Sequence, residues 1–276
     1  MRAVCQARVV GWCLEVLQAA FLVVDDVCDG AETRRGKPAY YRLPDVGAAR
    51  AVNDGLLLES LVFRLLRRHL RTHDSYVELL ELFRESIFVT ECGQLIDLNA
   101  PPQTIEDVAE RFTLVHYRKM AACKTSHYTF FLPVACALHL TDTASSQALT
   151  EARQICDAIG EYFQVQDDYL GCWGDEAMTG KGNNDVAEKK CTWLAVTALT
   201  RCTGPEQLLE LQKGLVRGDT GRVTAMYEEL GMRDAFLEYE ARSFASIRHQ
   251  LAQASALAAV RPVLEAVLSK MHGRVA

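Results

Sequence analysis

The sequence predicts an all-α protein folded as one domain over residues 1–276. Apolar residues recur at helical spacing along most of the chain, and no stretch shows the sustained alternation of apolar and polar residues that is typical of a strand. Only seven residues are proline, and 49% are hydrophobic, which is enough to bury a full core. The chain has no solenoid repeat and no low-complexity segment, so we expect a bundle of long core helices.

The first helix is expected at residues 3–29, where apolar residues are spaced by three and four. The residues that set this pattern are Val9, Val10, Cys13, Val16, Leu17, Ala20, Phe21 and Val24. Residues 30–44 are a predicted loop, because a glycine and two prolines interrupt regular structure there. A second helix is expected over residues 44–71, with arginines near its end that suit the negative end of the helix dipole.

A third helix is expected over residues 74–98, with Asp74 as its cap. Two consecutive prolines then break the chain. Thr104 and Asp107 have the spacing of a capping box, in which each side chain bonds the other residue's backbone N–H, although Glu or Gln is commoner at the third position. From there a helical pattern continues to about Leu140.

Residues 150–170 predict another long helix, and residues 171–185 a polar, glycine-containing loop. An apolar helix follows at residues 191–199. Residues 205–276 predict three or four amphipathic helices with ordinary charges and no residues that suggest chemistry.

Carboxylates gather where two of these apolar helices end. Asp25 and Asp29 are spaced i and i+4, so they lie on one helix face with Asp26 beside them. Two carboxylates about 6 Å apart repel by roughly 3 kcal/mol at an effective dielectric constant near 20, so a counter-charge is expected. Asp167 and Asp168 repeat the arrangement. Mg²⁺ suits both clusters, because it prefers oxygen ligands and shares them with substrate phosphates.

Cations follow the first cluster and occur again near the middle of the chain. Arg34 and Arg35 offer planar guanidinium groups that match phosphate oxygens, although a solvated charge run is the ordinary explanation of such a stretch. Lys124 lies among apolar residues, where it either keeps its charge at the surface or donates to a phosphate in a pocket. The face that carries Glu91 and Asp97 is by itself more typical of a surface than of a site.

Composition excludes several classes of function. The net charge of −6 and pI of about 5.7 argue against nucleic acid as the main partner and against a basic membrane-binding surface. The ten cysteines form no CxxC or Cys/His cluster, which favours reduced thiols in a cytosol-like compartment. We expect no membrane span, since no apolar run reaches about 18–20 residues, and no targeting peptide, because the N-terminus already has a helical pattern.

Two carboxylate clusters, nearby cations and apolar helices together fit a metal-bound diphosphate with a hydrophobic tail. Departure of an allylic diphosphate creates a carbocation and a pyrophosphate anion. Mg²⁺ and cationic side chains stabilise the anion, and an apolar pocket keeps water from the cation. No nucleophilic Ser or Cys and no His base is needed, and we find no Ser/His/Asp or Cys/His arrangement in the sequence.

Six motifs in order give the chain its resemblance to short-chain trans-prenyl diphosphate synthases of the eukaryotic farnesyl diphosphate synthase type. They are GWCLEVLQAAFLVVDDVCD, TRRGKP, TECGQLIDL, CKTSHYTFFLPVA, YFQVQDDYL and TGKGNNDVAEKKCTWL. The resemblance covers almost the whole chain. It implies an isoprenoid-synthase-type helical bundle with a central pocket between two aspartate-bearing helices, and a homodimer in the cytoplasm.

The implied reaction condenses isopentenyl diphosphate with dimethylallyl or geranyl diphosphate to give farnesyl diphosphate, by Mg²⁺-assisted ionisation to an allylic carbocation. The resemblance implies three Mg²⁺ ions per site, with Mn²⁺ as an alternative, held by Asp25, Asp26, Asp29, Asp167 and Asp168. The implied catalytic residues are Lys124, Thr125, Asp25 and Asp167. The implied substrate-binding residues are Gln18, Arg34, Arg35, Lys124, Thr125, Gln164, Lys181 and Lys190. Asp97 and Asp185 match acidic positions near the metals and lysines.

The chain departs from the family at three places. The second motif ends in Gly171, where the family has a third aspartate. The chain begins inside the family's first aspartate helix, so we expect the preceding helices and their isopentenyl-diphosphate motif to be absent. Family members that make the fifteen-carbon product carry two aromatics before the first cluster, whereas this chain has Ala20 and Phe21, which opens space for a twenty-carbon product.

Two further interpretations stay open at the level of the sequence. One intact and one altered aspartate motif resembles a terpene cyclase, although Asn184 and Asp185 are not followed by the pattern of a cyclase's second motif. An inactive, regulatory paralogue of a prenyl synthase is favoured by Gly171 and the expected short N-terminus. The retained aspartates and cations argue against it, because a dead site has no need of them.

Overall fold

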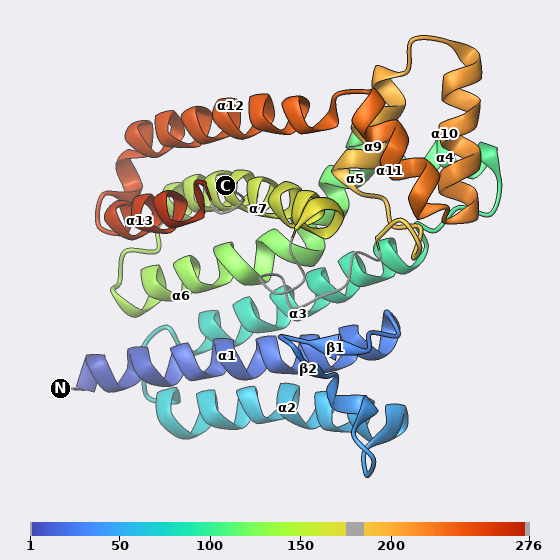
Figure 1. Ribbon diagram of the computed structural model, residues 1–276. Helices are drawn as coiled ribbons and strands as arrows, with labels where there is room; N and C mark the ends of the chain where they lie inside the picture. Colours follow the sequence, from blue (N-terminus) through green and yellow to red (C-terminus); the bar gives the residue numbers. More distant parts are fainter. Residues whose placement is uncertain (1, 175–184, 274–276) are drawn as a thin grey trace.

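The structure is a computed structural model that describes residues 2–174 and 185–273. In these ranges the regular secondary structure is helical apart from one small hairpin, so the all-α prediction is confirmed (Figure 1). The elements in chain order are α1 (Arg2–Cys28), β1 (Thr33–Arg34), β2 (Lys37–Pro38), η1 (Tyr40–Arg42), α2 (Gly47–Leu70), α3 (Tyr76–Leu98), α4 (Ile105–Arg111), α5 (Leu114–Ala121), η2 (Ala122–Phe131), α6 (Leu132–Leu140), α7 (Ser146–Trp173), α9 (Trp193–Arg201), α10 (Pro205–Arg217), α11 (Thr220–Glu229), α12 (Met232–Gln253), η3 (Ser255–Leu257) and α13 (Arg261–Met271).

The predicted loop after α1 contains an antiparallel hairpin that the sequence did not reveal. β1 pairs with β2, and Arg35 and Gly36 form the turn with φ angles of 55° and 73°. Two-residue hairpin turns of the primed type need positive φ at both positions, which Gly36 adopts without strain. Strands of two residues are too short to leave a periodic pattern in the sequence.

The helical pattern predicted from Thr104 to Leu140 is divided into four segments. Thr104 accepts a hydrogen bond from the Asp107 N–H and Asp107 bonds the Thr104 backbone, so the capping box is confirmed. Thr113 caps a new helix, α5, by accepting from the His116 N–H, and the chain then widens into the π-helix η2 before α6. The expectation for Asp74 is wrong, because Ser75 precedes α3 without a side-chain cap.

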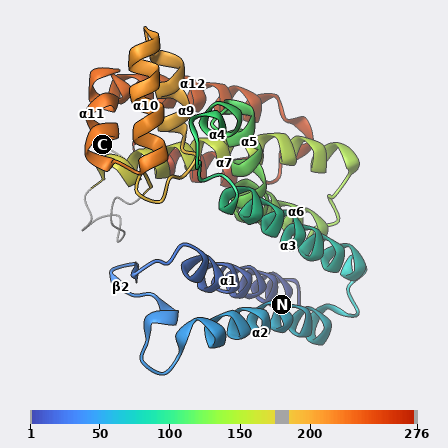
Figure 2. The same cartoon turned by 90° about the vertical axis from the view of Figure 1, so that its right-hand side faces the viewer.

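α1 and α2 lie side by side and form one layer of the bundle, below α3 and α6 in Figure 2. Val10, Leu17, Leu66, Phe83 and Leu132 are buried together where these helices meet. The π-helix η2 packs between α3 and α7, and α12 covers the other side of α7. The bundle therefore places the two aspartate helices, α1 and α7, on either side of α3 and η2.

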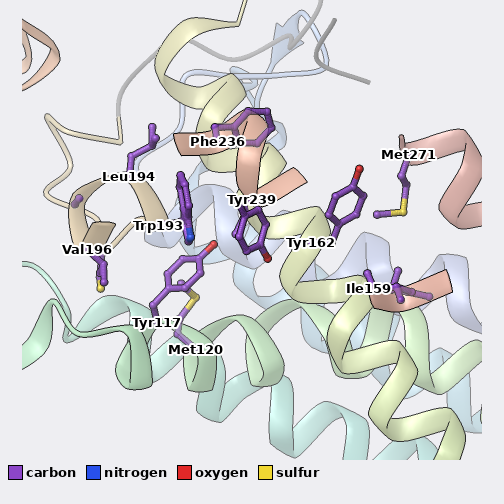
Figure 3. Packing of buried hydrophobic residues seen from close by; sticks show 14 of the residues in the cluster. Tyr117, Met120, Ile159, Tyr162, Trp193, Leu194, Val196, Phe236, Tyr239 and Met271 are labelled. Atoms are coloured by element: carbon purple, nitrogen blue, oxygen red, sulfur yellow. The ribbon is translucent and has the colours of Figure 1, made fainter. Parts of the chain in front are cut away.

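A second hydrophobic core joins α7 to the C-terminal helices. Figure 3 shows Tyr117, Trp193, Tyr239 and Phe236 packed together from α5, α9 and α12. The rings of Trp193 and Tyr239 lie 5.1 Å apart between centroids, a separation at which aromatic pairs attract one another. This core fixes α9, and with it the backbone that contacts the second aspartate cluster.

By length and composition alone, residues Ala3–Cys28 of α1 could cross a membrane, contrary to the sequence expectation. Core helices of globular proteins also meet that criterion. Val10, Cys13 and Leu17 on α1 are buried against the neighbouring helices, and the C-terminal end of α1 lines the central cavity. In this structure α1 is accordingly a helix of the bundle.

Candidate active site

A cavity of about 550 Å³ opens between the two aspartate helices. Its walls come from α1, α2, α3, η2, α7 and the segment 185–192. Asp25 and Asp29 line one side, and Asp167 and Asp168 line the other. The two predicted clusters, 138 to 143 residues apart in sequence, thus border one cavity, with apolar side chains such as Phe21 beside them.

The first cluster is held by an arginine from the β1–β2 hairpin. Arg34 donates from Nε to Asp26 Oδ1 at 2.8 Å and from Nη2 to Asp25 Oδ2 at 3.0 Å. Asp26 is only 3% exposed, so it needs this counter-charge. The hairpin therefore positions Arg34 at the end of α1, next to both carboxylates.

Lys124 lies between α1 and α3 and bridges their carboxylates. Its Nζ donates to Asp97 Oδ2 at 2.5 Å and lies 3.3 Å from Asp25 Oδ1. Burial lowers the pKa of Lys124, but the charges of Asp25, Asp97 and Asp29 outweigh that effect and raise the pKa above its ordinary value. The lysine is therefore a fixed cation inside the cavity, and of the two interpretations left open by the sequence the pocket-facing one agrees with the structure.

Asp97 lies beside the lysine, as the family resemblance implies, although its helix face taken alone is more typical of a surface. Its side chain is 8% exposed and paired with Lys124, so it belongs to the site and not to a surface. Glu91 lines the same cavity, and burial together with the nearby charge of Glu59 raises the pKa of Glu91. No local signal separates these carboxylates from exposed ones, because only the packing of α3 against η2 encloses them.

The π-helix places Lys124 and the next residue, Thr125, against opposite neighbours. A Cβ added to Gly93 on α3 would lie 2.3 Å from the Lys124 backbone nitrogen, and one added to Gly160 on α7 would lie 1.9 Å from Ser126 Oγ. Only glycine allows backbones to approach this closely. A π-helical hydrogen bond spans one more residue than an α-helical one, which changes the helix face that each later side chain occupies.

Hydrogen bonds connect Thr125 to the second cluster. Thr125 Oγ1 donates to Gln164 Oε1 at 2.7 Å, and Gln164 Nε2 donates to Asp168 Oδ1 at 3.0 Å. The Trp193 N–H donates to the other oxygen, Asp168 Oδ2, at 2.7 Å. Burial, reinforced by the charge of Asp185, raises the pKa of Asp168 well above its usual range. Asp168 therefore serves as a buried anchor of α7, while Asp167 is exposed along the cavity.

Lys190 closes the site from the segment after α7. Its Nζ lies 2.9 Å from Asp29 Oδ2 and 2.9 Å from Glu188 Oε2. Burial lowers the pKa of Lys190, but the negative charges of Asp29 and Asp185 raise it by more, so the net shift is upward. A cation from residue 190 is thus held across the cavity against a carboxylate from residue 29.

The other predicted site residues are placed as follows. Gln18 and Arg35 line the cavity, Arg35 with an exposed side chain. Lys181 lies outside the described residues. The sequence analysis missed the contribution of α2, from which Val52, Gly55 and Glu59 line the cavity. Nothing in the local sequence of α2 distinguishes these residues, since their role depends on α2 packing along α1.

Among residues 2–174 and 185–273, no group of three or more Asp, Glu, His or Cys side chains lies close enough together to hold a metal ion by itself. Arg34, Lys124 and Lys190 instead neutralise the first cluster. The donor chemistry fits a divalent ion that arrives with a diphosphate: Asp25, Asp29 and Asp167 present carboxylates from two sides of one cavity, and Mg²⁺ completes its shell with phosphate oxygens and water.

Comparison with known proteins agrees with this geometry. The polyprenyl synthetase family model matches residues 2–230. Farnesyl pyrophosphate synthase of Schizosaccharomyces pombe is 42% identical over 246 residues, which cover 88% of this chain and 70% of that protein. Farnesyl pyrophosphate synthase 2 of Arabidopsis thaliana is 40% identical over 267 residues, which cover 96% and 77%.

A solved structure extends the comparison to three dimensions. T. brucei farnesyl diphosphate synthase complexed with the bisphosphonate BPH-1326 matches with a TM-score of 0.91 and 31% sequence identity, over all of this chain and 98% of that chain. The fold, the two facing aspartate helices and the sequence matches therefore agree. The chain belongs to the polyprenyl synthetase family of prenyltransferases.

Proposed function

We propose that this chain makes farnesyl diphosphate by condensing isopentenyl diphosphate with dimethylallyl or geranyl diphosphate. The observation that carries the proposal is the single cavity bordered by Asp25 and Asp29 on one side and Asp167 on the other. Three cations, Arg34, Lys124 and Lys190, lie at the same end. The two farnesyl pyrophosphate synthases described above, of which this chain covers 70% and 77%, support the same reaction.

We assign the metal ligands by exposure. Asp25, Asp29 and Asp167 line the cavity and would hold Mg²⁺, three ions per site, or Mn²⁺ in its place. Asp26 is buried against Arg34 and Asp168 against Gln164 and the Trp193 N–H, so these two would position their neighbours. When bound, the metal neutralises the diphosphate and favours its departure as pyrophosphate.

The cations of the site bind and orient the leaving group. Lys124 and Arg34 already lie against the first cluster, so a diphosphate bound there meets fixed positive charge without reorganisation. Lys190 faces the same place from the opposite wall. The hydrogen bond from Thr125 to Gln164 keeps η2 at a constant distance from α7 and thereby orients the Lys124 side chain. Gln18 and Arg35, which line the cavity, would seat isopentenyl diphosphate, and Lys181 would contribute to binding the allylic diphosphate.

Apolar side chains below the aspartates would enclose the prenyl tail and exclude water from the carbocation. Phe21 and Tyr128 form an edge-to-face pair with centroids 5.1 Å apart, and Phe163 lines the same cavity. Ala20, one residue before Phe21, is only 4% exposed and lines the cavity, so no aromatic ring fills that position. This observation favours a second candidate product, the twenty-carbon diphosphate.

The family suggests the oligomeric state of this chain, and its cysteines suggest the compartment. We propose a homodimer in the cytoplasm, with no nucleic-acid partner and no membrane span. All ten cysteines are free, and Cys13, Cys136 and Cys156 are buried, where burial raises the pKa of each thiol and keeps it unreactive. A protein with ten free thiols suits a reducing compartment.

The proposal is tested by incubating the purified chain with Mg²⁺, isopentenyl diphosphate and geranyl diphosphate and identifying the products by mass. We expect a fifteen-carbon diphosphate, with the twenty-carbon compound as the second candidate, and no product in the presence of EDTA. Asp167→Asn should reduce the rate at least a hundredfold, whereas Asp234→Asn, at an exposed position on α12, should leave it unchanged. Absence of any prenyl product from the wild-type chain contradicts the proposal and favours the regulatory paralogue.

A further inference from the structure

One wall of the central cavity consists of small and apolar residues from α1 and α2. Ala20 and Val24 contribute to it from α1, and Val52, Gly55 and Leu56 contribute from α2. We call these five residues the α1–α2 wall. Their side chains carry no polar atom, and apolar linings of this kind bind the hydrocarbon parts of ligands. The wall therefore suits the tail of a prenyl diphosphate.

Gly55 allows the two helices to approach closely within this wall. A Cβ added to Gly55 would lie 2.7 Å from Val24 Cγ2 and 3.5 Å from the Ala20 carbonyl oxygen. Carbon atoms in contact prefer about 3.5–4.0 Å, so a side chain at residue 55 is incompatible with the present position of Val24. Valine in a helix has one strongly preferred χ1 rotamer, so rotation does not relieve the contact cheaply.

α1 and α2 run in opposite directions and are held together on both sides of this contact. Gly55 faces Val24 near the C-terminal end of α1, and farther from the aspartates the Cys13 thiol donates to the Val62 carbonyl at 3.8 Å. Directly after Val24, Arg34 binds the first aspartate cluster. Because both sides are fixed, the room for a side chain at residue 55 must come from Val24 and from the cavity that Val24 lines.

The lining of the cavity becomes charged one helical turn after Gly55. Glu59 lines the cavity there, farther from the aspartates than Gly55, and its Oε1 lies 3.7 Å from Arg84 Nη1 on α3. Glu91 on α3 lines the cavity as well. A hydrocarbon tail that entered among these groups would remove water from them, which costs free energy. Gly55 is therefore the last position of the α1–α2 wall on α2 before the charged end.

We propose that Gly55 determines the length of the product, because its missing side chain lets the prenyl tail extend along the α1–α2 wall as far as Glu59. The inference rests on the proposed function, since it concerns the tail of the same product. Ala20 alone does not open this path, because a side chain from α2 would fill the space beside it. Product length thus depends on two small residues that face each other from two helices.

The first test measures product length. Wild-type and Gly55→Val chains are incubated with Mg²⁺, isopentenyl diphosphate and dimethylallyl diphosphate, and the products are identified by mass. We expect the longest product of Gly55→Val to be shorter by at least one isoprene unit. Adding Val24→Ala removes the clashing Cγ2 and should restore the wild-type product. Gly11→Val is the matched control, since nothing lies within 4 Å of a Cβ at Gly11, and should leave product length unchanged.

The second test measures tail binding without turnover. The thermal unfolding midpoint is followed as the geranyl, farnesyl and geranylgeranyl thiolodiphosphates, in which sulfur replaces the bridging oxygen and slows ionisation, are titrated with Mg²⁺. We expect Gly55→Val to raise at least tenfold the half-maximal concentration of the longest analogue that stabilises the wild type, because added methyl groups fill the space of the tail. The half-maximal concentration of the geranyl analogue should not change.

Equal product lengths in wild type and Gly55→Val overturn the inference, and so does an equal loss of affinity for all the analogues. A wild type that only the geranyl analogue stabilises overturns it as well. If Gly55→Val does not fold, Gly55→Ala adds a single methyl group and decides the question by the same two measurements. A wild-type chain that binds the longer analogues but makes no prenyl product contradicts the proposed function, and the analogue titration then still decides the role of Gly55.

Discussion

Replacing Gly160 by alanine tests whether the close approach of α7 to the π-helix positions the site. The added Cβ would lie 1.9 Å from Ser126 Oγ, 2.4 Å from Ser126 Cβ and 2.7 Å from Ser126 Cα. Carbon atoms in contact prefer at least about 3.5 Å, so α7 and η2 must separate by roughly 1 Å. Because the contact includes backbone atoms, rotation of the serine side chain cannot relieve it.

The expected effects on stability and on activity are separate. Overpacking at a backbone contact costs about 3 kcal/mol, and the better helix propensity of alanine returns about 1 kcal/mol, so the free energy of unfolding should fall by about 2 kcal/mol. A shift of about 1 Å at the Thr125–Gln164 hydrogen bond should lower kcat by about a hundredfold. Denaturant unfolding and steady-state product formation measure the two effects.

Gly11→Ala provides the matched control. Gly11 lies inside α1 with nothing within 4 Å of an added Cβ, so the same substitution should stabilise the chain by up to about 1 kcal/mol without loss of activity. Adding Ser126→Gly to Gly160→Ala removes two of the three clashing atoms, and a double-mutant cycle should give a coupling of at least about 1 kcal/mol. A Gly160→Ala chain as stable and as active as wild type would falsify the argument.

Two further substitutions test the chemistry of buried side chains. His127 is 3% exposed, and burial together with the charge of Arg153 lowers its pKa to about 4. Between pH 6.5 and pH 4 the unfolded chain therefore binds more protons than the folded chain. The free energy of unfolding should fall by about 3 kcal/mol on acidification through that window. Urea unfolding at pH 7 and pH 4 should show that the His127→Gln variant lacks this loss. The raised pKa of Asp157 acts in the opposite direction, but wild type and variant share it. Equal losses of stability in wild type and variant would refute the role of His127. Ala20→Phe places a ring at a buried position of the cavity wall and should shift the products toward shorter chains; an unchanged mass spectrum of the products would mean that Ala20 does not set chain length.

Several features of the protein could be read from its sequence because they depend on neighbours a few residues away. Helical spacing of apolar residues predicted the bundle, and the Thr104–Asp107 capping box was found as expected. The two aspartate clusters and the cations Arg34 and Lys124 were recognisable as a diphosphate site, since carboxylates at the end of an apolar helix require counter-charge. The family motifs are equally local, and the comparisons confirmed the family.

Only the tertiary structure decided how these groups divide their tasks. Asp167 and Asp168 are adjacent in sequence, yet the Trp193 N–H and Gln164 bind Asp168 inside the protein while Asp167 faces the cavity. Asp97 became part of the site only because α3 packs against η2. The local sequence reveals neither role, because Trp193 lies 25 residues from Asp168 and Lys124 lies 27 residues from Asp97.

The π-helix and the close contact at Gly171 have the same kind of origin. Gly93 and Gly160 lie 67 residues apart, and their missing side chains matter only because both helices press on η2. A Cβ added to Gly171 would lie 2.6 Å from Asp185 Oδ2, a contact between α7 and the segment after it that only folding creates. Periodicity and charge order along the chain determined which helices form and which residues carry charge. Close approach of backbones distant in sequence determined where each charge lies, because excluded volume acts between atoms that meet only after folding.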